Sequence, residues 1–182
     1  MTNSDQLVLD KKNIDTILVL DFGSQYTQLI ARRIRELGVF SIILPWDISK
    51  ERILEINPTG IILSGGPESV TNNNTPRIPE IIFGLDIPIL GICYGMQTLA
   101  EQFGGQVTAS KTKEFGHASI TLEQASILFD GFDVGSLVDV WMSHGDHVSS
   151  LPDQFLLIAS TPSAPIAAMV HSKKPIYALQ FH

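Results

Sequence analysis

Four short apolar runs in the first half of the chain constrain its fold more than any other feature. They span residues 16–20, 41–44, 60–63 and 87–92. Runs of this length without alternation are typical of strands buried on both faces of a sheet. Helical spacing of apolar residues follows the first run, from Tyr26 to Leu37, and a short helix is indicated after the second. This alternation predicts a doubly wound, mostly parallel sheet flanked by helices.

The second half of the chain has a different pattern, in which short apolar segments follow one another with little helical spacing between them. These segments span residues 105–109, 117–122, 138–142, 155–159, 166–170 and 175–181. We expect them to form antiparallel strands added to the parallel core. Residues 1–13 are polar and aperiodic, so we expect a flexible tail there and one domain over residues 14–182. The expected fold class is therefore α/β, with a flavodoxin-like parallel sheet and antiparallel strands in the second half.

Composition argues against several classes of partner. The formal net charge of −7, without a basic stripe, argues against binding to nucleic acid. No apolar run is long enough for a membrane span, and the N-terminus lacks the basic and apolar regions of a signal peptide. A single cysteine cannot form an internal disulfide, which suits a reducing compartment. We therefore expect a cytoplasmic protein that binds neither nucleic acid nor membrane.

The only cysteine of the chain, Cys93, lies between the fourth predicted strand and a predicted helix over residues 96–103. Gly91 and Gly95 flank it in the pattern Gly-x-Cys-x-Gly, the cysteine form of the nucleophile elbow. Small flanking residues permit a tight turn that lifts the middle side chain above the sheet edge. The N-terminus of the following helix points its amides at the sulfur, which favours the thiolate. The pattern predicts that Cys93 is a nucleophile.

Two further segments are expected beside Cys93, because the carboxyl ends of parallel strands meet at one edge of a sheet. They are Ser64-Gly65-Gly66-Pro67 and Gln180-Phe181-His182, each at the end of a predicted strand. Gly66 can bring its backbone amide close to a substrate, and the amide of Tyr94 directly follows the nucleophile. These two amides are the expected donors to the oxyanion of a tetrahedral intermediate.

Five histidines compete for the role of the base that a cysteine nucleophile needs. They are His117, His144, His147, His171 and His182. His117 and His171 are expected at the surface. His144 and His147 are spaced like a pair of metal ligands, but no further cysteine or acidic cluster stands at ligand spacing, so we expect no metal site. His182 ends an apolar strand and would overhang the sheet edge, as a base must.

The segment Gly91-Ile92-Cys93-Tyr94-Gly95-Met96-Gln97 occurs together with the Ser64-Gly65-Gly66-Pro67 loop and the Gln180-Phe181-His182 end. On these residues the chain resembles the class I (triad) glutamine amidotransferase family. Three segments are more specific, and they resemble the glutaminase domains of GMP synthetases. They are residues 21–29 (DFGSQYTQL), 64–69 (SGGPES) and 139–146 (DVWMSHGD). The resemblance extends from residue 16 to residue 182.

The resemblance implies a defined reaction. Cys93 would attack the side-chain amide of glutamine, release ammonia and form a thioester that water hydrolyses to glutamate. His182 would move the protons, and the backbone amides of Gly66 and Tyr94 would form the oxyanion hole. By the same resemblance, the residues that hold the glutamine substrate would be Gly65, Gln97, Ser143, His144 and Gly145. No metal and no cofactor is expected in this domain.

The resemblance also implies a partner. Ammonia would pass to an ATP pyrophosphatase (synthetase) domain, on the same polypeptide or a separate subunit, that converts XMP into GMP. Mg-ATP is expected only in that domain, because the Ser-Gly-Gly-Val-Asp-Ser phosphate loop of that domain does not occur in this sequence. The full-length protein is expected to be a homodimer. The family pattern at the end is His-Pro-Glu, whereas this sequence stops at His182. We therefore expect a truncated chain with little glutaminase activity, because an acid that orients the base contributes strongly in related triads.

Three alternatives stay open at this point. The first is another amidotransferase of the same class, serving the synthesis of anthranilate, CTP or carbamoyl phosphate. The second is a different cysteine hydrolase with the same elbow, such as a peptidase or a glutamyl hydrolase. The third is a regulatory or docking module that has kept the fold without the activity.

Overall fold

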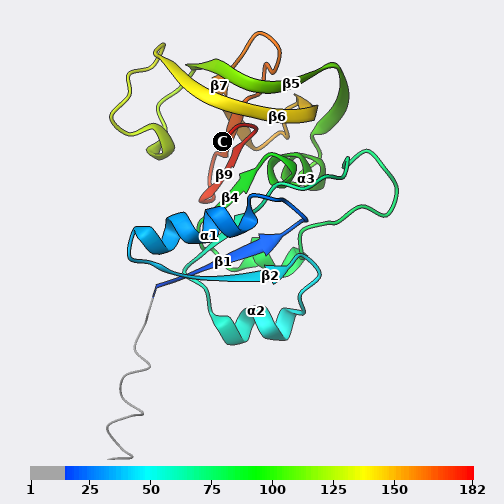
Figure 1. Cartoon of the computed structure of the whole chain (residues 1–182), viewed down its shortest axis with the longest axis vertical. Coiled ribbons are helices and arrows are strands. Elements are labelled where there is room, and N and C mark those ends of the chain that lie inside the picture. The colour runs from blue at the N-terminus through cyan, green and yellow to red at the C-terminus, as the bar shows by residue number, and fades with distance from the viewer. Residues whose placement is uncertain (1–14) are drawn as a thin grey trace, which may run out of the picture.

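The computed structural model describes residues 15–182, apart from the side chains of residues 110–114. The tail predicted over residues 1–13 lies outside this range. The elements, with η for a 3-10 helix, are β1 (Thr16–Asp21), α1 (Thr27–Glu36), β2 (Phe40–Pro45), α2 (Lys50–Ile56), β3 (Gly60–Leu63), η1 (Glu80–Gly84), β4 (Ile89–Ile92), α3 (Tyr94–Gln102), β5 (Gln106–Leu122), η2 (Ile127–Phe129), β6 (Leu137–Ser150), β7 (Phe155–Ser160), β8 (Ala168–His171) and β9 (Ile176–Leu179). All of the strands join one sheet in the order β2-β1-β3-β4-β9-β8-β7-β5-β6. Figure 1 shows β1 and β2 toward one end of the molecule, β5, β6 and β7 toward the other, and β4 and β9 between them.

The first five strands of that order, β2-β1-β3-β4-β9, run parallel to one another. The predicted doubly wound parallel sheet is therefore confirmed, and its strand order is that of the flavodoxin-like type. The strand β1, between β2 and β3, buries Leu18, Val19 and Leu20 completely, as expected for a strand covered on both faces. Burial of Leu18 and Leu20, with apolar side chains of β3, β4 and α3, forms the larger of two hydrophobic clusters.

The last five strands, β9-β8-β7-β5-β6, are joined by antiparallel pairs. Antiparallel additions are thus confirmed for the second half, with two differences from the prediction. The segments predicted at 105–109 and 117–122 belong to one long strand, β5, which pairs with β6 along most of its length. The prediction that segment 175–181 is purely antiparallel is wrong. Its strand, β9, pairs antiparallel with β8 on one side but parallel with β4 on the other.

The physical reason for the second difference is burial. The strand β9 lies between β4 and β8, with Ile176 and Ala178 fully or almost fully buried. A continuous apolar run suits any position in the middle of a sheet, so its direction relative to a neighbour is not written in the run itself. The antiparallel hairpin of β8 and β9 places β9 next to β4, and the direction that the hairpin gives β9 makes its pairing with β4 parallel.

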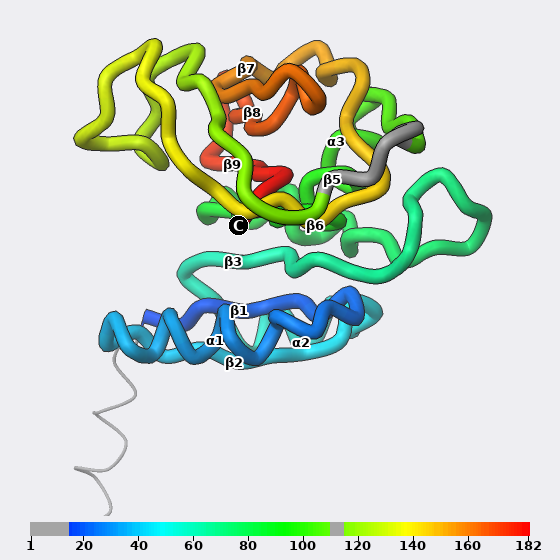
Figure 2. Tube along the Cα trace, turned by 45° about the horizontal axis from the view of Figure 1, so that its top comes forward, coloured from blue at the N-terminus to red at the C-terminus, as the bar shows by residue number. Residues whose placement is uncertain are grey.

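The end of the chain closes the antiparallel half. Beyond β9, the backbone N–H of His182 donates to Trp141 O at 3.0 Å, and the N–H of Trp141 donates to His182 O at 2.9 Å. The chain end therefore pairs with β6, the last strand of the sheet order, and Figure 2 shows it lying against that strand. The second hydrophobic cluster, which includes Phe181 and Met142, lies within this closed arrangement.

Candidate active site

The predicted elbow at Cys93 is confirmed by the backbone. Cys93 follows β4 and precedes α3 directly, with φ 51° and ψ −108°, a conformation that costs a non-glycine residue about 1–3 kcal/mol. A Cβ at Gly95 would lie 2.4 Å from Leu63 O, and one at Gly91 would lie 2.7 Å from Leu99 Cδ1. Glycine is needed at both positions because α3 packs this closely on β3 and β4.

All of the predicted site residues line one open cleft of about 950 Å³. They are Cys93, His182, Gly65, Gly66, Tyr94, Gln97, Ser143, His144 and Gly145. They come from four parts of the chain: the loop after β3, the elbow with α3, the middle of β6, and the end beyond β9. The tertiary structure therefore brings together the whole set that the sequence singled out.

The thiol of Cys93 is protonated at neutral pH in this structure. Its Sγ donates a hydrogen bond to Gln180 O at 3.1 Å, and burial raises the pKa of the thiol to about 12. The sequence-based expectation that the helix dipole favours the thiolate is therefore wrong for this state. Loss of water around the sulfur outweighs the attraction of the helix N-terminus, because desolvation penalises the charged form. Reaction at Cys93 requires a base.

The side chain of His182 is available for that role. Its imidazole packs against the ring of Tyr26, with centroids 5.0 Å apart and planes tilted by 44°. Partial burial lowers the pKa of His182 below its usual value, so the ring is neutral and can accept a proton near pH 7. Within the described part of the chain, no hydrogen bond joins this imidazole to Cys93, whose thiol is directed to Gln180 O.

The glycine loop after β3 is held against the end of β1. The N–H of Phe22 donates to Ser64 Oγ at 3.0 Å, and Ser64 O accepts from the N–H of Gly95 at 3.1 Å. A Cβ at Gly66 would lie 2.6 Å from Phe22 O, so only glycine fits there. The loop that carries one expected oxyanion donor is thus packed directly beside the helix start that carries the other, Tyr94.

The side chain of Gln97 connects three parts of the site. Its Nε2 donates to Asp146 O on β6 at 2.8 Å and to Gln180 Oε1 at 3.2 Å. Gln97 is almost fully buried on α3, and Gln180 is fully buried beyond β9. This buried pair holds α3, β6 and the chain end in a fixed relation.

The sequence comparisons agree with this geometry. Residues 18–182 match the family model "Glutamine amidotransferase class-I". The chain belongs to the class I glutamine amidotransferase family. Two similar relatives are the GMP synthases (glutamine-hydrolyzing) of Hahella chejuensis, 57% identical, and of Hamiltonella defensa, 56% identical. The alignments cover 91% and 94% of this chain but 33% and 34% of those proteins, so the chain spans about a third of their length.

Solved structures give the same family and fold. A protein from Thermoplasma acidophilum, provisionally named as a GMP synthase subunit, is 35% identical, with a TM-score of 0.77 over 93% of this chain and 84% of the other. A glutamine amidotransferase from Thermotoga maritima is 21% identical, with a TM-score of 0.73 over 93% and 76% of the two chains. At that identity the second likeness shows the fold alone.

Other residues of this amidotransferase cleft were not placed in the site from the sequence. They include Ser24, Gln25, Tyr26, Glu68, Ser69 and Asp146. A turn places Tyr26 there: Asp21 Oδ1 accepts hydrogen bonds from Gly23 N–H and from the Thr27 hydroxyl. The sequence could have indicated them, because they fall in the segments 21–29, 64–69 and 139–146, on which the resemblance to the glutaminase domains of GMP synthetases rests.

Two other histidines of the amidotransferase fold, His117 and His171, do not line the cleft. His117 is exposed and approaches Asp139 at 3.2 Å, as expected of a surface residue. His171 was expected at the surface, and this is wrong: it is buried between Phe103 and Phe155. Its Nδ1 accepts the N–H groups of Lys173 and Lys174, so the ring caps the turn after β8.

His144 and His147 do not act as a facing pair. Both lie on β6, where an odd spacing places side chains on opposite faces, and only His144 lines the cleft. Among the side chains that the structure describes, no group of three or more His, Cys, Asp or Glu residues is arranged to hold a metal ion. None of the helices within residues 15–182 has the length and apolar character needed to cross a bilayer.

Proposed function

We propose that this chain is a glutaminase domain, which hydrolyses the side-chain amide of glutamine through a thioester on Cys93. The observation that carries the proposal is the elbow. The strained residue Cys93 lines the same cleft as His182 and the glycine loop. Membership in the class I glutamine amidotransferase family supports glutamine as the substrate.

The first half-reaction begins with transfer of the Cys93 proton to the imidazole of His182. The thiol exchanges its hydrogen bond to Gln180 O for one to the imidazole. The sulfur attacks the amide carbon, and the amides of Gly66 and Tyr94 receive the negative charge on oxygen. The imidazolium then gives the proton to the amide nitrogen as the C–N bond breaks. Ammonia leaves, and a thioester remains.

Water completes the second half-reaction. His182 accepts a proton from water while the oxygen attacks the thioester carbon, and the same two amides receive the second oxyanion. Expulsion of the Cys93 sulfur yields glutamate, and the sulfur recovers its proton from the imidazolium. The sum of both halves consumes glutamine and water and gives glutamate and ammonia, with no cofactor in this domain.

We assign substrate holding to the polar rim of the cleft. Gly65 in the loop, and Ser143, His144 and Gly145 on β6, would contact the α-amino and carboxylate ends of glutamine. Gln97 would act by fixing β6 beside α3, because its amide nitrogen already donates to Asp146 O and Gln180 Oε1.

We further infer the use of the ammonia. A synthetase domain, on the same polypeptide or on a separate subunit, would convert XMP into GMP with Mg-ATP. The support is that the relatives at 56–57% identity are named GMP synthases and are about three times as long as the part aligned here. A cytoplasmic location suits a free nucleophilic thiol, which needs a reducing compartment. A homodimeric full-length protein stays a prediction.

The test is glutamine hydrolysis by the full-length protein, measured as glutamate and ammonia formed. Cys93→Ala is expected to abolish hydrolysis while leaving the fold intact, because the thioester cannot form. A glutamine-like electrophile should label Cys93, and peptide-like electrophiles should not. Labelling by peptide-like reagents alone would favour a peptidase, and a folded protein with neither labelling nor turnover would favour the docking module.

A further inference from the structure

The loop of residues 64–79, between β3 and η1, contains turns and bends but no helix or strand. It starts at the glycine pair and is unusually long for a connection inside a compact domain. Gly66, near the start of the loop, carries one of the two proposed oxyanion donors, while the other is the amide of Tyr94 on α3. The position of this loop relative to α3 therefore determines whether both amides can reach one oxygen atom.

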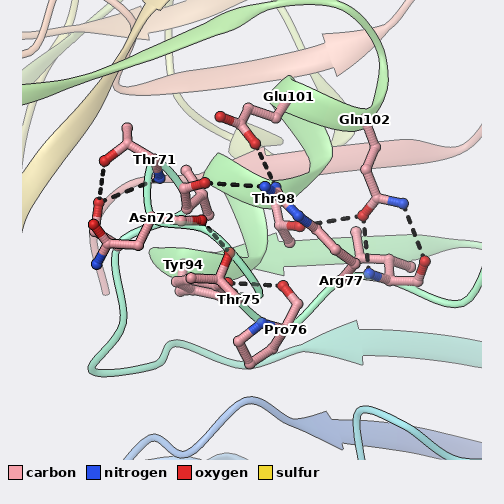
Figure 3. A network of polar contacts seen from close by, with 12 residues as sticks. Thr71, Asn72, Thr75, Pro76, Arg77, Tyr94, Thr98, Glu101 and Gln102 are labelled. Carbon is pink, nitrogen blue, oxygen red and sulfur yellow. Dashed lines mark hydrogen bonds and ion pairs between the residues drawn. The ribbon is translucent and has the colours of Figure 1, made fainter.

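The side chain of Tyr94 ties the loop to the helix. Its hydroxyl donates to Pro76 O at 2.7 Å (Figure 3), and its ring is almost completely buried. Burial raises the pKa of the Tyr94 phenol, so the hydroxyl keeps its proton and remains a donor at neutral pH. The same residue thus supplies a backbone donor on one side and a loop anchor on the other.

Phe22, just beyond β1, lies against both Gly66 of the loop and the ring of Tyr94. Its carbonyl oxygen is the atom that excludes any Cβ at Gly66, and its ring centroid lies 5.5 Å from that of Tyr94. The Tyr94 ring is therefore held between Phe22 and the loop. A shift of either changes the spacing of Gly66 from the start of α3.

The far end of the loop is fixed to the far end of α3. Arg77 pairs with Glu101 and donates to Val70 O at 3.0 Å. Gln102 accepts from the N–H of Ile78 at 2.9 Å and donates to Ile78 O at 3.0 Å (Figure 3). These anchors hold the loop on the helix, but only the Tyr94 contact starts from a residue that bears an oxyanion donor.

We propose that the side chain of Tyr94 is a positioning residue for the oxyanion hole. By binding Pro76 O, its hydroxyl sets the spacing between the loop that carries Gly66 and the start of α3, which carries the Tyr94 amide. The inference deepens the proposed glutaminase function and rests on it. Because oxyanion donors act mainly when charge develops in the transition state, a misplaced donor lowers kcat more than it changes KM.

Tyr94→Phe tests the proposal, because it removes only the hydroxyl and keeps the ring beside Phe22. In the full-length protein we expect kcat for glutamine hydrolysis to fall about tenfold with KM changed by less than about twofold, a smaller loss than the roughly 10²–10³ for removing an oxyanion donor outright. Tyr177→Phe is the matched control, since Tyr177 lies on β9 and does not line the cleft. It should keep the wild-type values.

A second variant tests the same loop from its other end. Gln102→Met removes both hydrogen bonds to Ile78, and we expect a fall in kcat of about twofold to threefold, again with KM little changed. The number of active sites is measured by labelling with a glutamine-like electrophile. Dividing the rate by this number gives a kcat that does not include unfolded protein. Retention of the wild-type kcat per labelled site by both variants would overturn the proposal, as would a raised KM with unchanged kcat.

Failure of this inference is distinguishable from failure of the proposed function. A folded wild-type protein that does not hydrolyse glutamine overturns the proposed function, and the inference falls with it. An active wild-type protein whose kcat is unaffected by Tyr94→Phe and Gln102→Met overturns the inference alone.

Discussion

The side of the cleft that carries the proposed nucleophile, Cys93, is built from residues adjacent in sequence. The side that carries the proposed base, His182, is assembled from distant ones. On the first side, β4, Cys93 and α3 follow one another, and two close-packed glycines determine the turn. On the second, His182 is held by backbone pairing with Trp141 and by the ring of Tyr26. A local turn is fixed by steric limits, while the base depends on the correct closure of the whole second half.

The largest expected effect lies on the base side. His182→Gln should lower kcat about 10³-fold, within the usual contribution of general acid–base catalysis, because the thiol with a pKa of about 12 loses its proton acceptor. The change should leave the midpoint of thermal unfolding nearly unaltered, since the residue is only partly buried. Labelling of Cys93 by an electrophile should slow as well. An unchanged labelling rate would mean that Cys93 ionises without this histidine.

A substitution in the elbow should act on stability instead. Gly95→Ala places a Cβ 2.4 Å from Leu63 O, and neither backbone can yield easily, so we expect a loss of about 2–3 kcal/mol in the free energy of unfolding. Gly84→Ala in η1 is the matched control, because its Cβ would meet nothing within 4 Å. It should change stability by less than about 0.5 kcal/mol. Equal effects of the two substitutions in urea unfolding would contradict the packing argument.

The smallest expected effect is a displaced pH profile. Burial lowers the pKa of His182, so the neutral base persists below the usual pKa, and kcat/KM should decline only as the pH falls through that lowered value. Because the pKa of the Cys93 thiol is about 12, ionisation of this thiol should give the pH profile no alkaline limb near neutral pH. Tyr26→Ala should expose the imidazole and move the acid limb toward higher pH. An acid limb that stays in place would show that the ring does not control the burial of His182.

Much of the fold could be predicted because its signals are local. The apolar runs gave the parallel strands, and the helical spacing gave α1 and α3. The direction of β9 beside β4 was missed because a run buried on both faces fits either direction. His171 was missed because its burial depends on Phe103 and Phe155, which come from other elements.

The candidate site divides in the same way. The sequence alone determined the elbow, since Gly91 and Gly95 permit a turn that puts Cys93 above the sheet edge. It also identified part of the cleft lining, but not the residues near Tyr26, Ser69 and Asp146. Only the tertiary structure decided how deeply the thiol is buried, which partner it binds, and what holds His182. The reason is physical: backbone sterics act between neighbours in the chain, whereas desolvation and hydrogen bonding depend on every segment packed around the group.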